Sequence, residues 1–254
     1  MRNFLSGLLF LTAVNLSTGP AQAADAGWRI DQNTNAHGNI QINITAHAME
    51  INIPAQKYKL YSFAPNWNVV FINGRVGTYI DFPYDQFMGS MLGRLGSQLG
   101  NDIQMLALPK PNLVKEDGLE FAVYDYTIRP TQEEKKQLLI KNSNTVLYSA
   151  RSIKAKYMRL PDIPKQIRVL ACKITCVPMS SDLPLSFSCL DGFKQHLAVL
   201  TTTLKRREKA VTITQPDLKK LKRVKTETEL FSRNSVSDVF ELFDDSGDEK
   251  KPKR

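Results

Sequence analysis

The chain has 254 residues and a formal net charge of +9, and 42% of its residues are hydrophobic. That hydrophobic content is ordinary for a globular protein and excludes a chain that is disordered throughout. The charge would suit anionic lipid head groups, acidic glycans or nucleic acid. The basic segments contain no aromatic residue on which bases could stack, which argues against nucleic-acid binding.

The first residues have the three parts of a secretory signal peptide. Arg2 supplies a positive charge, residues 4–16 form an apolar run, and Ala21-Gln22-Ala23 is a cleavage sequence. The apolar run is shorter than the roughly 20 residues of a membrane-spanning helix. We therefore expect cleavage between Ala23 and Ala24, and a periplasmic or secreted protein. No cysteine follows the run, so no lipid anchor is expected.

After the signal, the pattern predicts one strand after another. Hydrophobic residues alternate with polar ones from Ile40 to Ile44, which is typical of a half-buried strand. The alternation shifts by one residue near 46–48, where we expect a bulge or bend. Asn73-Gly74 predicts the turn of a β-hairpin. Further strands are expected over 49–53, 57–64, 67–72 and 76–82.

An amphipathic helix is expected over residues 87–100. Phe87, Met91, Leu95 and Leu99 recur at every fourth position and would lie on one face. Four glycines in this range weaken a helix by about 1 kcal/mol each relative to alanine. The glycines would allow the helix to pack closely on a sheet, or to move as a cover over the sheet's concave face.

The second half of the chain repeats the strand pattern and adds helices. Residues 131–141 are expected to form a surface helix that starts with a Thr-x-x-Glu capping box. Residues 163–174 are expected to form a further helix. The basic group Lys205-Arg206-Arg207 reads as part of solvated strand faces and a hairpin turn. Strands are expected over 119–128, 145–160, 183–190, 196–203, 210–214 and 221–230.

These elements predict an α+β fold. The sheet is expected to be antiparallel and strongly curved, forming an open half β-barrel with two or three helices covering one side. Residues 1–23 would be the signal peptide, 24–231 the half-barrel domain and 232–254 a disordered charged tail. We expect the protein to be a monomer.

Three cysteines, Cys172, Cys176 and Cys189, lie close together in the sequence. In an oxidising compartment two of them would pair. Cys172 and Cys176 would share one helical turn, which does not readily give disulfide geometry. We therefore expect a Cys176–Cys189 disulfide. The Cys-x3-Cys spacing and the distant histidines predict no metal site.

The chain lacks the common catalytic signatures. It has no Gly-x-Ser-x-Gly elbow, His-Glu-x-x-His pair, phosphate-binding loop or dinucleotide fingerprint. Asp31, His37, His47 and Ser62 would supply a hydrolase triad only if the fold brought them together. We expect that the protein is not an enzyme and binds no cofactor.

The order of elements and several local segments resemble the LolA/LolB-like half-barrel of periplasmic lipoprotein carriers. The segments are 67–74, 157–161, 182–185 and 215–219. The similarity extends over about residues 27–230 and implies an open barrel that binds a lipid or acyl chain. No functional residue of the carriers matches a position here, so none is assigned.

This interpretation predicts a protein that binds a lipid or acyl chain, either free or as part of a lipoprotein. Basic residues at the rim would meet anionic head groups or an anionic membrane surface. The alternative is a structural or assembly protein of the cell envelope that acts through a strand edge or the 232–254 tail. The residues expected to line a lipid site are Trp67, Val69, Phe71, Phe87, Met91 and Leu95.

Overall fold

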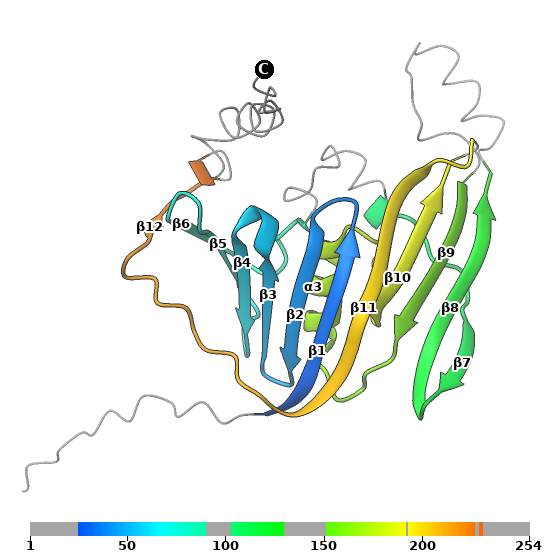
Figure 1. Ribbon diagram of the computed structural model, residues 1–254, viewed down its shortest axis with the longest axis horizontal. Helices are drawn as coiled ribbons and strands as arrows, with labels where there is room; N and C mark the ends of the chain where they lie inside the picture. The colour runs from blue at the N-terminus through cyan, green and yellow to red at the C-terminus, as the bar shows by residue number, and fades with distance from the viewer. Residues whose placement is uncertain (1–24, 90–102, 130–150, 192, 227–228, 231–254) are drawn as a thin grey trace, which may run out of the picture.

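The structure is a computed structural model that describes residues 25–89, 103–129, 151–191, 193–226 and 229–230. Its strands form one sheet in the order β12-β6-β5-β4-β3-β2-β1-β11-β10-β9-β8-β7 (Figure 1). Neighbouring strands are antiparallel, except that β12 is parallel to β6. The expected antiparallel sheet is therefore confirmed, and it is open.

The first half of the sheet is a meander in which each strand pairs with the next along the chain. Ile30, Ile42 and Ile51 are direct partners across three neighbouring strands, and all three are buried. This row shows why period-two alternation predicted the region well. The elements are β1 (Asp25–Thr34), β2 (Gly38–Thr45), β3 (Ala48–Ile53), the short 3-10 helix η1 (Pro54–Gln56), β4 (Tyr58–Phe63), β5 (Val69–Asn73) and β6 (Thr78–Phe82).

The expected bulge near residues 46–48 is instead a full reversal of the chain. Strands β2 and β3 pair as a hairpin around this point. The Thr45 hydroxyl accepts hydrogen bonds from the backbone N–H groups of His47, at 3.2 Å, and Ala48, at 3.0 Å. These bonds satisfy the backbone of a tight turn, so the shift of the hydrophobic pattern marks the end of one strand and the start of the next.

The second half of the sheet consists of β7 (Asn112–Glu116), β8 (Leu119–Ile128), β9 (Arg151–Met158), β10 (Leu183–Leu190), β11 (His196–Val211) and β12 (Lys222–Arg223). Strand β11 runs through Lys205-Arg206-Arg207, where a hairpin turn had been expected between two strands. It continues because β1 supplies partners from Leu200 to Val211. Strand β12 is much shorter than the expected 221–230.

Helix α3 (Lys165–Thr175) lies within one residue or two of its expected position. Within the described residues it is the one complete α-helix, whereas two or three helices had been expected. The helix expected over 131–141 lies outside the described residues, as does that over 87–100 from residue 90 onward. Phe87 itself is not helical.

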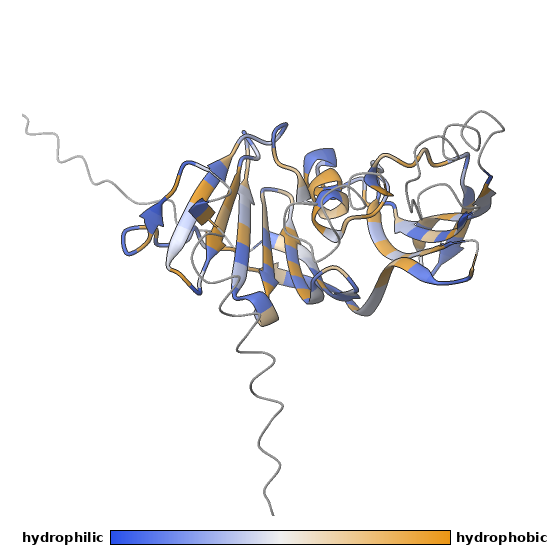
Figure 2. Ribbon diagram, turned by 90° about the horizontal axis from the view of Figure 1, so that it is seen from above, coloured by the Kyte–Doolittle hydropathy of each residue, from blue (hydrophilic) through white to orange (hydrophobic). Residues whose placement is uncertain are grey.

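The sheet curves around the side on which α3 lies, as Figure 2 shows from above. Apolar residues of the helix, among them Ile167, Leu170 and Ile174, join the main hydrophobic core with β1 to β6. The ammonium of Lys205 on β11 reaches the ring of Phe121 on β8, 4.7 Å from its centroid. Because β9 and β10 separate those strands, the contact fits a sheet that curves toward this face.

Candidate functional site

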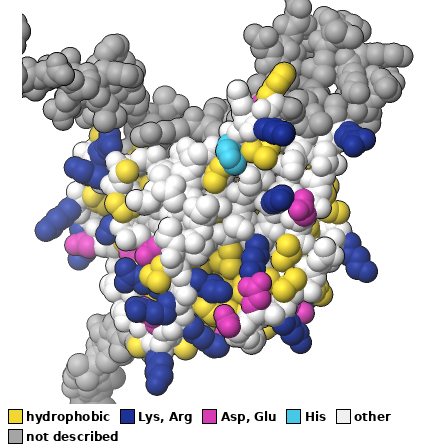
Figure 3. All heavy atoms as spheres, turned by 45° about the vertical axis from the view of Figure 1, so that its right-hand side comes forward, with side chains coloured by type: hydrophobic (Ala, Val, Ile, Leu, Met, Phe, Trp, Pro, Cys, Tyr) yellow, Lys and Arg dark blue, Asp and Glu magenta, His cyan; other side chains and the backbone are white. Residues whose placement is uncertain are grey.

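A cleft of about 450 Å³ lies at one end of the sheet, where the β7–β8 turn, the end of β9, the start of β1 and the end of β11 meet. Hydrophobic and charged side chains alternate in its lining. The face in Figure 3 shows hydrophobic side chains between basic and acidic ones in its lower half. The lining residues are Trp28, Lys115, Gly118, Leu119, Glu120, Arg159, Leu160, Pro161, Asp162 and Arg207.

A tight hairpin builds one wall of the cleft. Asp117 and Gly118 connect β7 to β8, and both have positive φ, at 50° and 75°. Two such residues make the turn that best matches the twist of paired strands. Glycine meets this requirement without strain, and aspartate is among the residues that tolerate it. The turn places Lys115 opposite Glu120 at the cleft.

The segment after β9 builds the opposite wall. The backbone N–H of Arg159 donates to the carbonyl of Glu120 at 2.9 Å, which extends the β8–β9 pairing by one residue. Leu160 then turns into the core and is only 2% exposed. Pro161 and Asp162 follow on the surface before α3 begins.

Trp28 on β1 forms an apolar part of the cleft. It is 4% exposed, and its direct cross-strand partners are Ile44 and Arg207. Its indole N–H has no hydrogen-bond acceptor among the residues that the structure describes. Buried indole N–H groups usually find an acceptor, so this donor is unused, and its nitrogen is shielded from solvent.

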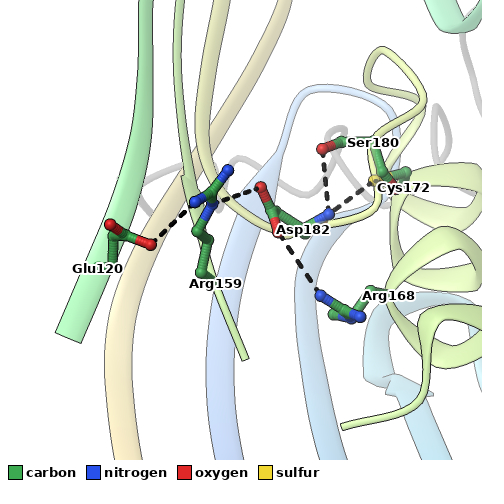
Figure 4. Close-up of polar contacts among 6 residues, drawn as sticks. All are labelled: Glu120, Arg159, Arg168, Cys172, Ser180 and Asp182. Carbon is green, nitrogen blue, oxygen red and sulfur yellow. Dashed lines mark hydrogen bonds and ion pairs between the residues drawn. The ribbon is translucent and has the colours of Figure 1, made fainter. Parts of the chain in front are cut away.

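A chain of charged side chains connects the cleft wall to α3 (Figure 4). Arg159 Nη1 lies 2.9 Å from Glu120 Oε2, and Arg159 Nε lies 3.6 Å from Asp182 Oδ2. The second oxygen of Asp182 lies 3.5 Å from Arg168 Nη1 on α3. Two carboxylates and two guanidinium groups make the chain formally neutral. The hydrogen bond that Arg159 donates to Glu120 raises the pKa of Arg159.

The backbone around Asp182 is fixed by two further contacts. Its N–H donates to the hydroxyl of Ser180 at 3.1 Å, and its carbonyl accepts from the thiol of Cys172 at 3.8 Å (Figure 4). Asp182 is 8% exposed. Burial raises the pKa of the Cys172 thiol to about 12, so the thiol is protonated at neutral pH and is no nucleophile.

Two basic side chains of the cleft are held more loosely. Arg207 Nη2 lies 3.1 Å from Asp162 Oδ2, and their side chains are 61% and 50% exposed. Lys115 is exposed and has no ion pair with any described residue. Exposed ion pairs contribute between about 0 and 1 kcal/mol, so both cations are free to exchange partners.

The residues expected from the sequence to line a lipid site lie elsewhere. Trp67, Val69, Phe71 and Phe87 are at most 7% exposed and pack in the main hydrophobic core. Met91 and Leu95 lie outside the described residues. Sequence reasoning missed the cleft, although the Asp117-Gly118 dipeptide is a hairpin signal that could have located its first wall.

The expected Cys176–Cys189 disulfide is wrong, because all three cysteines are free and buried. Cys176 ends α3 in the left-handed conformation. Cys189 lies within β10 between its partners Ile153 and Ala198. It packs in the second hydrophobic cluster together with Cys172, a cluster to which Cys176 does not belong.

The side chains considered for a hydrolase triad make structural contacts. His37 Nε2 lies 2.8 Å from the carbonyl of Ile174 on α3, and Ser62 donates to the carbonyl of Trp67. Within the described part of the chain, no three His, Cys, Asp or Glu side chains are grouped to hold a metal ion.

Comparison with known proteins gives no family for this chain. No family model matches it, and no curated protein matches it. Among solved structures it is similar to an uncharacterized conserved protein from Thermus thermophilus, at 10% identity and a TM-score of 0.37. That similarity covers 79% of this chain and 90% of the other. In the described ranges, no helix is both long and apolar enough to cross a bilayer.

Proposed function

We propose that this protein binds a lipid or acyl chain in the cleft beside Trp28 and carries it in the cell envelope. The observation that carries this proposal is the composition of the cleft. Leu119 and Pro161 expose apolar surface to it, the nearly buried Trp28 and Leu160 lie behind them, and charged side chains surround that surface. An apolar surface with a charged border suits an amphiphile, whose chain leaves water while its head group stays at the edge.

The curvature of the sheet supports the same function. We infer that the open sheet is a half β-barrel, because the contact between Lys205 and Phe121 brings β11 and β8 together on one side. A curved open sheet leaves a concave end that its own side chains do not fill, and the cleft lies at such an end. Export through the N-terminal signal, action in the periplasm or outside the cell, and a monomeric state belong to the same proposal.

The proposal is tested by what the purified full chain carries. Native mass spectrometry and lipid extraction should detect an acyl-chain ligand, and a fluorescent fatty acid should bind after delipidation. Leu119→Trp fills the cleft and should weaken that probe at least about tenfold. Leu113→Trp is the matched control on the exposed strand β7, outside the cleft, and should bind normally. Equal binding by both variants would contradict the proposed site.

The alternative, an assembly protein of the envelope, is favoured by strand β7. It is an edge of the described sheet, all five of its residues are exposed, and Leu113 and Val114 are 51% and 37% exposed. Such an edge can accept a strand from another protein. For an assembly protein, Val114→Pro should abolish a complex seen in envelope extracts by cross-linking. For a carrier, it should leave lipid content unchanged.

A further inference from the structure

We infer that the ligand of the cleft is a single-chain amphiphile with an anionic head group, and that Arg207 and Lys115 bind this head group while Arg159 does not. The inference rests on the proposed function and makes it more specific. It follows from how the three basic side chains of the lining are held.

Arg159 is already committed to other groups. It contacts Glu120 on β8 and Asp182 before β10, so its guanidinium lies between two carboxylates. Moving it toward a ligand would leave Asp182, which is 8% exposed, with Arg168 as its remaining cation. Removing one cation from a largely buried ion-pair network is destabilising. Arg159 therefore holds the cleft wall to the rest of the fold.

Arg207 and Lys115 can bind a ligand at little cost. The partner of Arg207 is Asp162, an exposed carboxylate in a weak pair, and Lys115 has no ion pair among the described residues. The lining holds three basic and two acidic side chains, so one positive charge remains to be balanced. An anionic head group supplies this balance, whereas a cationic one would add to the excess.

The register places these two cations around the apolar surface. Lys115 lies on β7 opposite Glu120, and Arg207 lies on β11 opposite Trp28. A head group between them leaves its chain against Trp28, Leu119 and Leu160.

The size of the cleft favours one chain over two. Its volume of about 450 Å³ is in the lower half of the range of about 300–1,000 Å³ that small-molecule pockets occupy. A lipid with two chains would leave one chain exposed to water, and that chain would gain no free energy from burial. A fatty acid is the simplest molecule that satisfies both the charge and the size.

The experiment compares three probes that share one chain length: a fatty acid, the fatty alcohol and the alkyl trimethylammonium ion. Each displaces a fluorescent fatty acid from the delipidated full chain, below its micelle concentration. We expect the acid to bind at least about tenfold more tightly than the alcohol, the effect of one charge-assisted hydrogen bond. The ammonium ion should bind most weakly.

Three substitutions and one matched control assign the selectivity to residues. Arg207→Gln and Lys115→Gln should each reduce the acid-to-alcohol ratio several-fold. Arg206→Gln is the matched control, because its side chain is also 61% exposed and ion-paired, to Glu208, but does not line the cleft. Arg159→Gln should lower the unfolding temperature and weaken the binding of the acid and of the alcohol by the same factor.

The results separate the inference from the proposed function. Equal affinity for acid and alcohol, or an Arg159→Gln variant that alone removes the preference, would overturn the inference while the carrier function stands. If no probe displaces the fluorescent fatty acid or binds at all, the proposed function itself fails. A preference that Arg206→Gln removes as strongly as Arg207→Gln would also overturn the inference, because it would come from net charge alone.

Discussion

At the scale of single residues, the charged side chains around the cleft differ in how strongly their ion pairs hold them in place. Asp182 bridges Arg159 and Arg168, with its two oxygens 3.6 Å and 3.5 Å from them, and little of the aspartate reaches water. Arg207 and Asp162 meet at 3.1 Å but are half exposed or more. The shorter contact is thus the weaker one in water, since exposed pairs are screened and buried charges are not.

Replacement of Asp182 by asparagine should therefore be costly. We expect a loss of about 3 kcal/mol in the free energy of unfolding, because Arg168, which is largely buried, and Arg159 lose the anion that they share. Urea unfolding monitored by circular dichroism measures this. Asp125→Asn, which breaks the exposed pair with Lys154, should cost less than about 1 kcal/mol. A similar cost for both variants would show that the Asp182 chain is not structural.

The thiols provide a second test at this scale. Burial raises the pKa values of Cys172 and Cys176 to about 12 and also raises that of Cys189. All three should react with a thiol reagent only after unfolding, and a reducing agent should leave the unfolding temperature unchanged. A native chain in which only one thiol can be titrated after unfolding would contain a disulfide and would contradict the structure.

These residue contacts could not be predicted from the sequence. Glu120, Arg159 and Asp182 lie far apart along the chain and belong to no known motif. The pairing of β8, β9 and β10 brings them together as neighbours across three strands, and no local pattern encodes the register that places these charged side chains side by side. The disulfide prediction failed for the same reason, since spacing along the chain does not show which strand face a cysteine occupies.

At the scale of elements, hydrophobic periodicity predicted most strands because each buries one face. Strands β8 and β10 have the expected bounds. Strand β11 was split in the prediction, because Lys205-Arg206-Arg207 interrupts its apolar pattern while backbone pairing with β1 continues. Strand β7 was not predicted, since its two apolar residues are exposed and give no alternation.

The contact between Gly89 and the end of α3 gives a prediction for an element boundary. A Cβ atom at residue 89 would lie 1.7 Å from the carbonyl oxygen of Lys173, so the backbones touch there. Gly89→Ala should lower the free energy of unfolding by about 3 kcal/mol, at the upper end of overpacking costs. Gly77→Ala, with open space but a positive φ, should cost about 1 kcal/mol. Equal costs measured by urea unfolding would exclude the contact.

At the scale of the whole molecule, the core lies between α3 and one curved sheet, and many ionisable groups are buried with it. The antiparallel α+β class followed from the sequence, because strand patterns dominate and helices are few. The open sheet was also expected, but the position of the cleft did not follow, because it depends on where the β7–β8 turn, β1, β9 and β11 meet at one end of the sheet.

Buried tyrosines and thiols should make the fold sensitive to alkaline pH. Burial raises the pKa values of Cys172 and Cys176 to about 12 from 9.0, and that of Tyr126 to about 12 from 10.0. The unfolded chain then loses these protons at lower pH than the folded chain, so stability should fall between about pH 9 and about pH 12. Lys173, whose pKa is lowered by burial, acts in the opposite sense but is a single group.

Urea unfolding at a series of pH values measures this decline. The variant Tyr126→Phe removes one of the groups and should decline less steeply. A stability that stays constant or rises through this range would contradict the burial of these side chains.

The location of a bound acyl chain tests the central claim most directly, and the chain's two tryptophans make it measurable. Both belong to the main hydrophobic core, but Trp28 also lines the cleft, whereas Trp67 lies away from it among the residues that the sequence suggested for a lipid site. A brominated fatty acid quenches tryptophan fluorescence at short range. Binding in the cleft predicts strong quenching in Trp67→Phe, which keeps Trp28, and weak quenching in Trp28→Phe. The reverse result, or binding without quenching of either tryptophan, would contradict the cleft as the ligand site.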